Sequence, residues 1–337
     1  MDVDWLEKSW RRSGAPGAAV AILTGGALRT ELYFGAAVAG RPMTSAAVFD
    51  SASLTKPLFA WYVLELAASG ELDLYAPIAI DYATLGAAED PRLGRITPAM
   101  VLSHQTGLPN WRPDGEPLRL VATPGEQVVY SGEGFQLLLK TLQNERGADT
   151  VAAELQDLLD RFGMTGSSFV DPPAGAGSSF VDPPAGAGSS FVDPPAGAAG
   201  SDGGSTGYAV AHDADGRPLA RRARERIGAY GTLDVTLPDY AKFLESAFWG
   251  WDSVSARRIR ALTTGPYGVP QGGRTLGWGC WSRADGTIVL HQNGDNPGYK
   301  HLALVDPAAG EAVVALTNGE GGLAFTDQLA ARFRRTD

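Results

Sequence analysis

Residues 53–70 read SLTKPLFAWYVLELAASG, and this stretch decides how we expect the chain to fold. Its apolar residues recur at the spacing of one α-helix, and they are Leu58, Trp61, Tyr62, Leu64, Leu66 and Ala67. Gly70 ends the pattern, as glycine commonly does at the C-terminus of a helix. The stretch therefore predicts a buried helix that begins close to Ser53 and Lys56.

Strand-like patterns lie at both ends of the sequence, on either side of this helix. They are expected at residues 17–23, 28–38, 287–291, 301–306 and 311–317. Gly25-Gly26 between the first two runs predicts a β-hairpin, and a final helix is expected at 323–335. We expect an α/β fold of the α+β type, in which one antiparallel sheet is built from both chain ends and is flanked by helices.

The middle of the chain carries short helical patterns that glycine and proline separate. The length of 337 residues, at about 150 residues per domain, predicts two domains. We expect a sheet domain from residues 1–70 and 228–337, and an inserted, mainly helical domain from residues 71–227. A cleft is expected between the two.

The charge balance argues against two classes of partner. The chain has 28 basic and 38 acidic residues and a formal net charge of −10, so we expect neither a nucleic acid nor a membrane as a partner. The sequence shows no signal peptide and no long apolar run, so we expect a cytoplasmic protein, although a chain with its signal removed would look the same.

No metal or other cofactor is expected. The single Cys280 excludes an internal disulfide and a cysteine-based metal cluster, and we expect a packed thiol there. The four histidines lack the spacing of a zinc site.

Ser53 and Lys56 are the first candidate for chemistry. A spacing of three residues places them on one face of a helix, one turn apart, where the amine could take the proton of the hydroxyl. Pro57 supports a helix start at this point, because proline is tolerated in the first turn. The plainer interpretation is a serine that caps the helix beside a solvated lysine.

Two further segments are candidates. Residues 124–132 combine a Pro-Gly turn with a short extended piece that ends in Tyr130, and a helix is expected from about Gly134. Residues 291–299 follow a strand and run into Gly294, where a backbone could approach a ligand. The plainer interpretations are that Tyr130 is a half-buried core residue and that residues 291–299 form a turn after an edge strand.

Taken in this order, the three segments resemble the serine β-lactamase and penicillin-recognising superfamily. The similarity is to its class C-like branch, which includes family VIII carboxylesterases and D-amino-acid peptidases. Residues 102–109, LSHQTGLP, look like that branch's L-x-S-H-T-S-G-L-P segment, and residues 70–77 and 239–244 continue the match. The resemblance covers about residues 15–330 and implies a β-lactamase/DD-peptidase-like fold.

The resemblance also implies roles for individual residues. Ser53 would be the acylated nucleophile, Lys56 the base that activates it, and Tyr130 the partner that transfers a proton to the leaving group. The oxyanion hole would be formed by the backbone N–H groups of Ser53 and Asp295. The substrate would be a small ester or amide.

Two departures from the family pattern bear on the substrate. Gly132 stands where class C β-lactamases have an asparagine that binds the amide of the β-lactam. The triplet Gln292-Asn293-Gly294 stands where they have Lys-Thr-Gly, although His291, displaced by one residue, is an alternative for the first position. Because each lost charge-assisted hydrogen bond is worth about 1.5 to 3 kcal/mol, we expect a carboxylesterase with at most weak β-lactamase activity.

Other functions stay open at this point. They are a D-stereospecific amidase or peptidase, a β-lactamase, and a non-catalytic binding protein of the same fold. Ser205, within a G-x-S-x-G match, is a rival nucleophile, but no apolar strand precedes it as that motif requires. The sequence does not indicate an oligomeric state.

Residues 166–198 contain three identical copies of an 11-residue unit, GSSFVDPPAGA. Asp-Pro-Pro blocks a helix in each copy, so we expect a loop. Such a loop could be a tolerated surface feature, or it could reshape a nearby binding site.

Overall fold

The structure is a computed structural model. The residues that it describes are 1–80, 90–113, 115–170, 207–221, 226–265, 267, 273–283 and 285–334.

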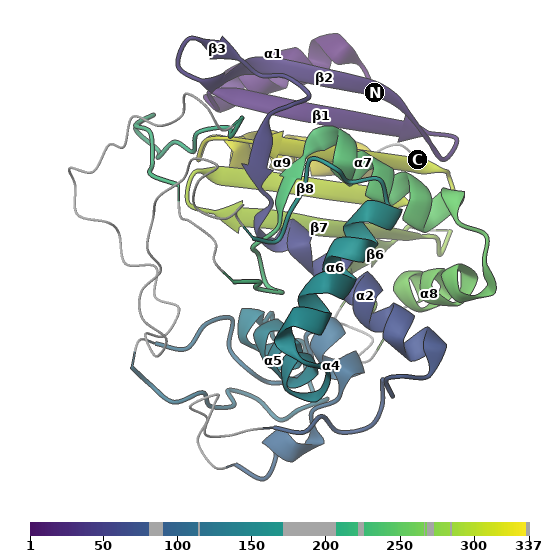
Figure 1. Ribbon diagram of the computed structural model, residues 1–337. Helices are drawn as coiled ribbons and strands as arrows, with labels where there is room; N and C mark the ends of the chain where they lie inside the picture. Colours follow the sequence, from purple (N-terminus) through teal and green to yellow (C-terminus); the bar gives the residue numbers. More distant parts are fainter. Residues whose placement is uncertain are drawn as a thin grey trace.

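One seven-stranded antiparallel sheet organises the fold, in the order β3-β2-β1-β9-β8-β7-β6 (Figure 1). Its strands are β1 (Gly17–Thr24), β2 (Ala27–Val38), β3 (Arg41–Pro42), β6 (Gly279–Ser282), β7 (Ile288–Asn296), β8 (Tyr299–Asp306) and β9 (Glu311–Thr317). The N-terminal hairpin joins the C-terminal strands where β1 pairs with β9, in the register Ala18 to Thr317. The prediction of one antiparallel sheet built from both chain ends is confirmed.

Both faces of the sheet are covered, which explains the continuous apolar runs in its central strands. On one face, Val20 packs in a cluster with Leu6 of α1 (Val3–Ser13) and Phe325 of α9 (Gly322–Arg334). On the other face, Ala21 and Leu316 belong to the main core. A strand that is buried on both sides needs apolar residues at every position, so it loses the alternation of a half-buried strand.

The second face carries the helices that lead to the candidate site. They are α2 (Thr55–Ser69), α7 (Leu237–Glu245), a π-helical turn at Ser246–Gly250 and α8 (Val254–Thr264). Helix α7 contacts β1 and β9, and α2 contacts α8 (Figure 1).

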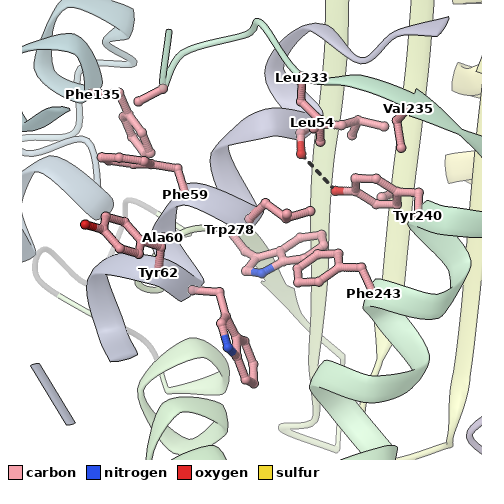
Figure 2. Packing of buried hydrophobic residues seen from close by; sticks show 14 of the residues in the cluster. Leu54, Phe59, Ala60, Tyr62, Phe135, Leu233, Val235, Tyr240, Phe243 and Trp278 are labelled. Carbon is pink, nitrogen blue, oxygen red and sulfur yellow. Dashed lines mark hydrogen bonds between the residues drawn. The ribbon is translucent and has the colours of Figure 1, made fainter. Parts of the chain in front are cut away.

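Helix α2 is the buried helix that the sequence predicts. Phe59 and Tyr62 lie among core residues that include Phe135 and Trp278, as Figure 2 shows. A helix that is apolar on nearly all sides has to be surrounded by protein. Gly70 ends it with φ 84°, in the left-handed region.

The remaining helices are a 3-10 turn at Leu93–Arg95, α4 (Pro98–Leu102), α5 (Gly132–Arg146) and α6 (Ala148–Arg161). Of these, α4 and α5 lie on the side of α2 away from the sheet, and α6 runs across α2 in this view (Figure 1). The division into a sheet domain and an inserted domain, and the cleft between them, stay predictions. Among the described residues, no helix is both long and apolar enough to cross a membrane.

A two-stranded sheet leads directly into the candidate site. Strand β4 (Val48–Asp50) pairs with β5 (Asp234–Thr236). Ser168 bridges to β5 and Tyr208 bridges to β4. Most of the triple repeat, from residue 171 onward, lies outside the described residues, as does Ser205.

His301 ties the large sheet to β4. Its Nδ1 accepts the N–H of Thr317 at 3.1 Å, so Nε2 carries the hydrogen and donates to the Asp50 carbonyl at 2.7 Å. These two partners fix the neutral tautomer, because a protonated ring would direct a second N–H against the N–H of Thr317. Burial lowers the pKa of His301 to about 4.

The structure departs from the sequence-based boundaries in several places. Strand β7 continues to Asn296, where a strand end at His291 was expected. Helices α1 and α8 and strands β3, β4, β5 and β6 were not predicted. Cys280 is buried, as expected.

The close approach at Gly35 generates a test of packing. Gly35 has φ 67°, and a Cβ there would collide with the Pro16 carbonyl oxygen and the Trp10 ring. Gly40 has φ 77° and open space around it, so it is a matched control for the backbone strain. We expect Gly35→Ala to lower the free energy of unfolding by about 1–3 kcal/mol more than Gly40→Ala in urea titrations. Equal losses would contradict the packing described here.

The buried His301 predicts a pH dependence of stability. Because the folded protein lowers the pKa of His301 to about 4, the unfolded chain, with a pKa of about 6.5, binds more protons in this interval. Stability is therefore lost as the pH falls, and this residue contributes about 2 kcal/mol of that loss between about pH 6.5 and 4.5. His301→Gln should reduce the slope of unfolding free energy against pH, whatever its effect on absolute stability; an unchanged slope would refute the assignment.

Candidate active site

Ser53 lies in a short 3-10 turn, Ala52–Leu54, between β4 and α2. Ala52, directly before it, has φ 48°, a left-handed conformation that alanine rarely adopts. The Asp50 side chain accepts the N–H of Ala52 at 2.9 Å and holds this conformation. Gly231 makes room for it, since a Cβ there would lie 3.3 Å from the Ala52 carbonyl. The turn is therefore held from both sides.

Lys56 is the central polar group of the site. Its Nζ lies 2.9 Å from the Ser53 Oγ and 2.6 Å from the Tyr230 carbonyl oxygen. The side chain is only 1% exposed, and the rings of Tyr130 and Phe135 have their centroids 5.1 and 5.6 Å from Nζ. Burial lowers the pKa of Lys56 below that of a free lysine, because the charged form loses its hydration.

Tyr130 lies beside this amine, two residues before the start of α5. Its ring stacks on His104 with a centroid distance of 4.3 Å, and the His104 Nδ1 accepts the N–H of Ser131 at 3.0 Å. Burial alone would raise the pKa of Tyr130, but the charge of Lys56 and hydrogen bonds with Ser53, Lys56 and Gln292 outweigh it. The net pKa is lowered. The phenol is therefore suited to exchange a proton with its neighbours.

The structure separates the two alternatives for the third segment. Gln292 is 4% exposed, and its Nε2 lies 3.3 Å from the Tyr130 Oη. His291 points to the other side of β7, because side chains alternate along a strand. Its ring stacks on Trp281 with a centroid distance of 5.0 Å, and burial lowers its pKa to about 4. Gln292 therefore faces the site, and His291 does not.

Gly294 allows β7 to approach the turn of Ser53. A Cβ at this position would lie 2.7 Å from the Ser51 carbonyl oxygen, so a larger residue would force the two segments apart. Asn293 and Asp295 have exposed side chains. The carboxylate of Asp295 accepts from the Lys300 Nζ at 2.6 Å.

The direction of the Asp295 backbone follows from its strand neighbours. Cys280 donates its N–H to Gly273 at 2.7 Å, away from β7, so the hydrogen-bonded pair between β6 and β7 is Gly279 with His291. N–H groups of alternate residues point to the same side of a strand. The N–H of Asp295 therefore points away from β8, past the end of the pairing with β6.

Trp111 fills the space beside Gly132. A Cβ at Gly132 would lie 2.5 Å from the Trp111 ring, so no other side chain fits there without displacing the indole. Trp111 also packs edge-on against Tyr230 with a centroid distance of 4.8 Å.

Three residues at the site were not predicted from the sequence: Trp111, Tyr230 and Arg274. The Arg274 guanidinium lies 5.4 Å from the centroid of the Tyr130 ring. None of the three belongs to a motif, and each is distant from Ser53 in sequence, so no local signal could have found them. In the described part of the chain, no cluster of His, Cys, Asp or Glu could hold a metal ion.

Comparisons with known proteins agree with this arrangement. A Beta-lactamase family profile matches residues 3–335. No curated protein matches the sequence.

Solved structures share the fold at low sequence identity. A beta-lactamase/D-alanine carboxypeptidase from Pseudomonas syringae superposes with a TM-score of 0.77 at 17% identity, over 99% of each chain. A class C beta-lactamase gives 0.76 at 15% identity, over 100% of this chain and 98% of the other. The octameric penicillin-binding protein homologue from Pyrococcus abyssi gives 0.74 at 21% identity, over 99% of this chain and 78% of the other. With the family profile spanning nearly the whole sequence, the chain belongs to the beta-lactamase family.

Proposed function

We propose that this protein is a serine hydrolase that forms an acyl-enzyme on Ser53, and that its substrates are small carboxylic esters. The observation that carries the proposal is the 2.9 Å contact between the Ser53 Oγ and the buried Lys56 Nζ. Burial lowers the pKa of this amine and so favours its neutral form, and only the neutral amine can accept a proton.

The first half-reaction follows from this geometry. Neutral Lys56 takes the proton of Ser53 as the Oγ attacks the ester carbonyl carbon. The carbonyl oxygen becomes an oxyanion, which the N–H groups of Ser53 and Asp295 would stabilise. Tyr130 then gives its proton to the departing alcohol as the ester C–O bond breaks, and the proton on Lys56 restores the phenol.

Water completes the cycle by the same groups. It attacks the acyl carbon of the Ser53 ester and its proton passes to the neutral Lys56, either directly or through the phenol of Tyr130, which gives its own proton to the amine. That proton returns to the Oγ as the bond to the acyl carbon breaks and the acid departs. The phenol suits both directions, because it lies between Ser53 and the amine and the charge of Lys56 and its hydrogen bonds lower its pKa.

Two features favour esters over β-lactams. Gln292 is neutral, and its Nε2 is already engaged with the Asn293 carbonyl at 2.8 Å and with Tyr130. Trp111 occupies the space where a side chain at position 132 could contact the amide of a substrate. An ester needs neither contact, because its alkoxide is a better leaving group than an amide nitrogen.

The nucleophile is tested by substitution. We expect the wild type to hydrolyse p-nitrophenyl acetate and butyrate with little turnover of nitrocefin, and Ser53→Ala to reduce ester turnover at least about a thousandfold. Ser69→Ala, at the far end of α2, serves as the matched control. Intact mass after quenching should show an acyl adduct that Ser53→Ala lacks. Ester turnover that survives in Ser53→Ala, or rapid nitrocefin cleavage, would contradict the proposal.

The base is tested by replacing the lysine with a cation that cannot give up its proton. Arginine holds its proton at all accessible pH values, so Lys56→Arg should lower kcat for ester hydrolysis at least about a hundredfold. In the wild type, kcat/KM should rise with pH through a midpoint below the pKa of a free lysine, because the amine has to lose its proton. A Lys56→Arg variant with near-normal kcat would exclude Lys56 as the base.

A further inference from the structure

Arg274 lies on a fixed turn just before β6. Its carbonyl accepts the N–H of Tyr267 at 2.9 Å, and its backbone bridges to Gly279. Gly277, within the same turn, donates to the Leu102 carbonyl at 3.0 Å. The backbone therefore holds this arginine in place, with its guanidinium near the Tyr130 ring.

The guanidinium of Arg274 has no acceptor among the described residues, although it is half-buried. Other half-buried arginines of this protein differ in this respect. Arg112 pairs with Glu133 at 2.9 Å, and Arg146 pairs with Glu154 at 2.5 Å. A partly buried cation without an anion is costly, and its five donors are arranged to bind a carboxylate in two-point fashion.

Arg274 brings a permanent positive charge to the site of a protein that is acidic as a whole. This charge lowers the pKa of His104, after the larger effect of burial. No aspartate or glutamate of the described residues influences Lys56, His104, Tyr130 or Arg274 in this way. The whole chain has a formal net charge of −10, so the charge of Arg274 is opposite in sign to that of the protein.

We infer that Arg274 binds an anionic group of the substrate, and that the preferred substrate is an ester with a carboxylate on its leaving-group side. The inference rests on the proposed function in one respect, which is that the carboxylate belongs to the leaving group and not to the acyl group. Tyr130, beside Arg274, is the group that would protonate the leaving oxygen. Gln292 cannot supply this charge, since it is neutral and its amide is engaged within the site.

The hydrolysis itself is unchanged by this contact. The ester C–O bond breaks, the alcohol oxygen takes its proton from Tyr130, and the distant carboxylate stays ionised and paired with Arg274 throughout. The contact positions the leaving group, so it acts on substrate recognition.

A pair of esters that differ by one charge tests the inference. We would compare kcat/KM for 3-acetoxybenzoate with kcat/KM for its methyl ester, which carries the same acetyl group and no charge. The wild type should prefer the anion. Arg274→Gln should reduce the ratio of the two values about 10- to 100-fold, and Arg274→Lys should retain part of it. Arg258→Gln, an exposed arginine on α8, is the matched control and should leave the ratio unchanged.

An unchanged ratio in Arg274→Gln overturns the inference, including the case in which both esters slow by the same factor. That case would mean that Arg274 acts through Tyr130 or Lys56. A second measurement separates the anion site at Arg274 from the proposed acyl-enzyme on Ser53. It compares the affinity for benzoate, measured by calorimetry, of Ser53→Ala and of the double variant that also carries Arg274→Gln. Binding that weakens about tenfold or more without Arg274 supports the anion site even if Ser53 forms no acyl-enzyme, and equal binding refutes it.

Discussion

The buried amine of Lys56 is the constraint on which the rest of the site depends. An ammonium ion at 1% exposure without a carboxylate would cost several kcal/mol, so the fold favours its neutral form. The contacts of Nζ with Ser53 and with the Tyr230 carbonyl join the start of α2 to the segment before β5. The proposed nucleophile and base are thus fixed by the packing that forms the core.

The sheet explains how distant parts of the chain meet at this amine. Strand β1 pairs with β9, so the two ends of the sequence form one support beneath α2. His301, on β8, holds β4, and β4 leads directly into the turn of Ser53. Gly294 then lets β7 reach the same turn, which places Gln292 against Tyr130. Loss of any one of these contacts would loosen the turn without removing a candidate catalytic group.

The sequence could predict the elements whose pattern is local. The hairpin, helix α2 and the pairing of Ser53 with Lys56 follow from spacing alone. The extension of β7 could not be predicted, because Asn293, Gly294 and Asp295 have low strand propensity and are held by pairing with β8. The contact of Trp111 with Gly132 and the position of Arg274 arise from tertiary packing, which leaves no periodic signal in the sequence.

The most direct test of this account is the titration of Lys56 itself. The chain has only five lysines, so a protein labelled with ¹³C at the lysine side chains gives few signals, and Lys56→Arg identifies the one of interest. We expect the Lys56 signal to titrate clearly below the value of about 10.4 of a free lysine. A midpoint at or above that value would mean that the amine stays charged at neutral pH, and it would contradict the role of Lys56 as the base.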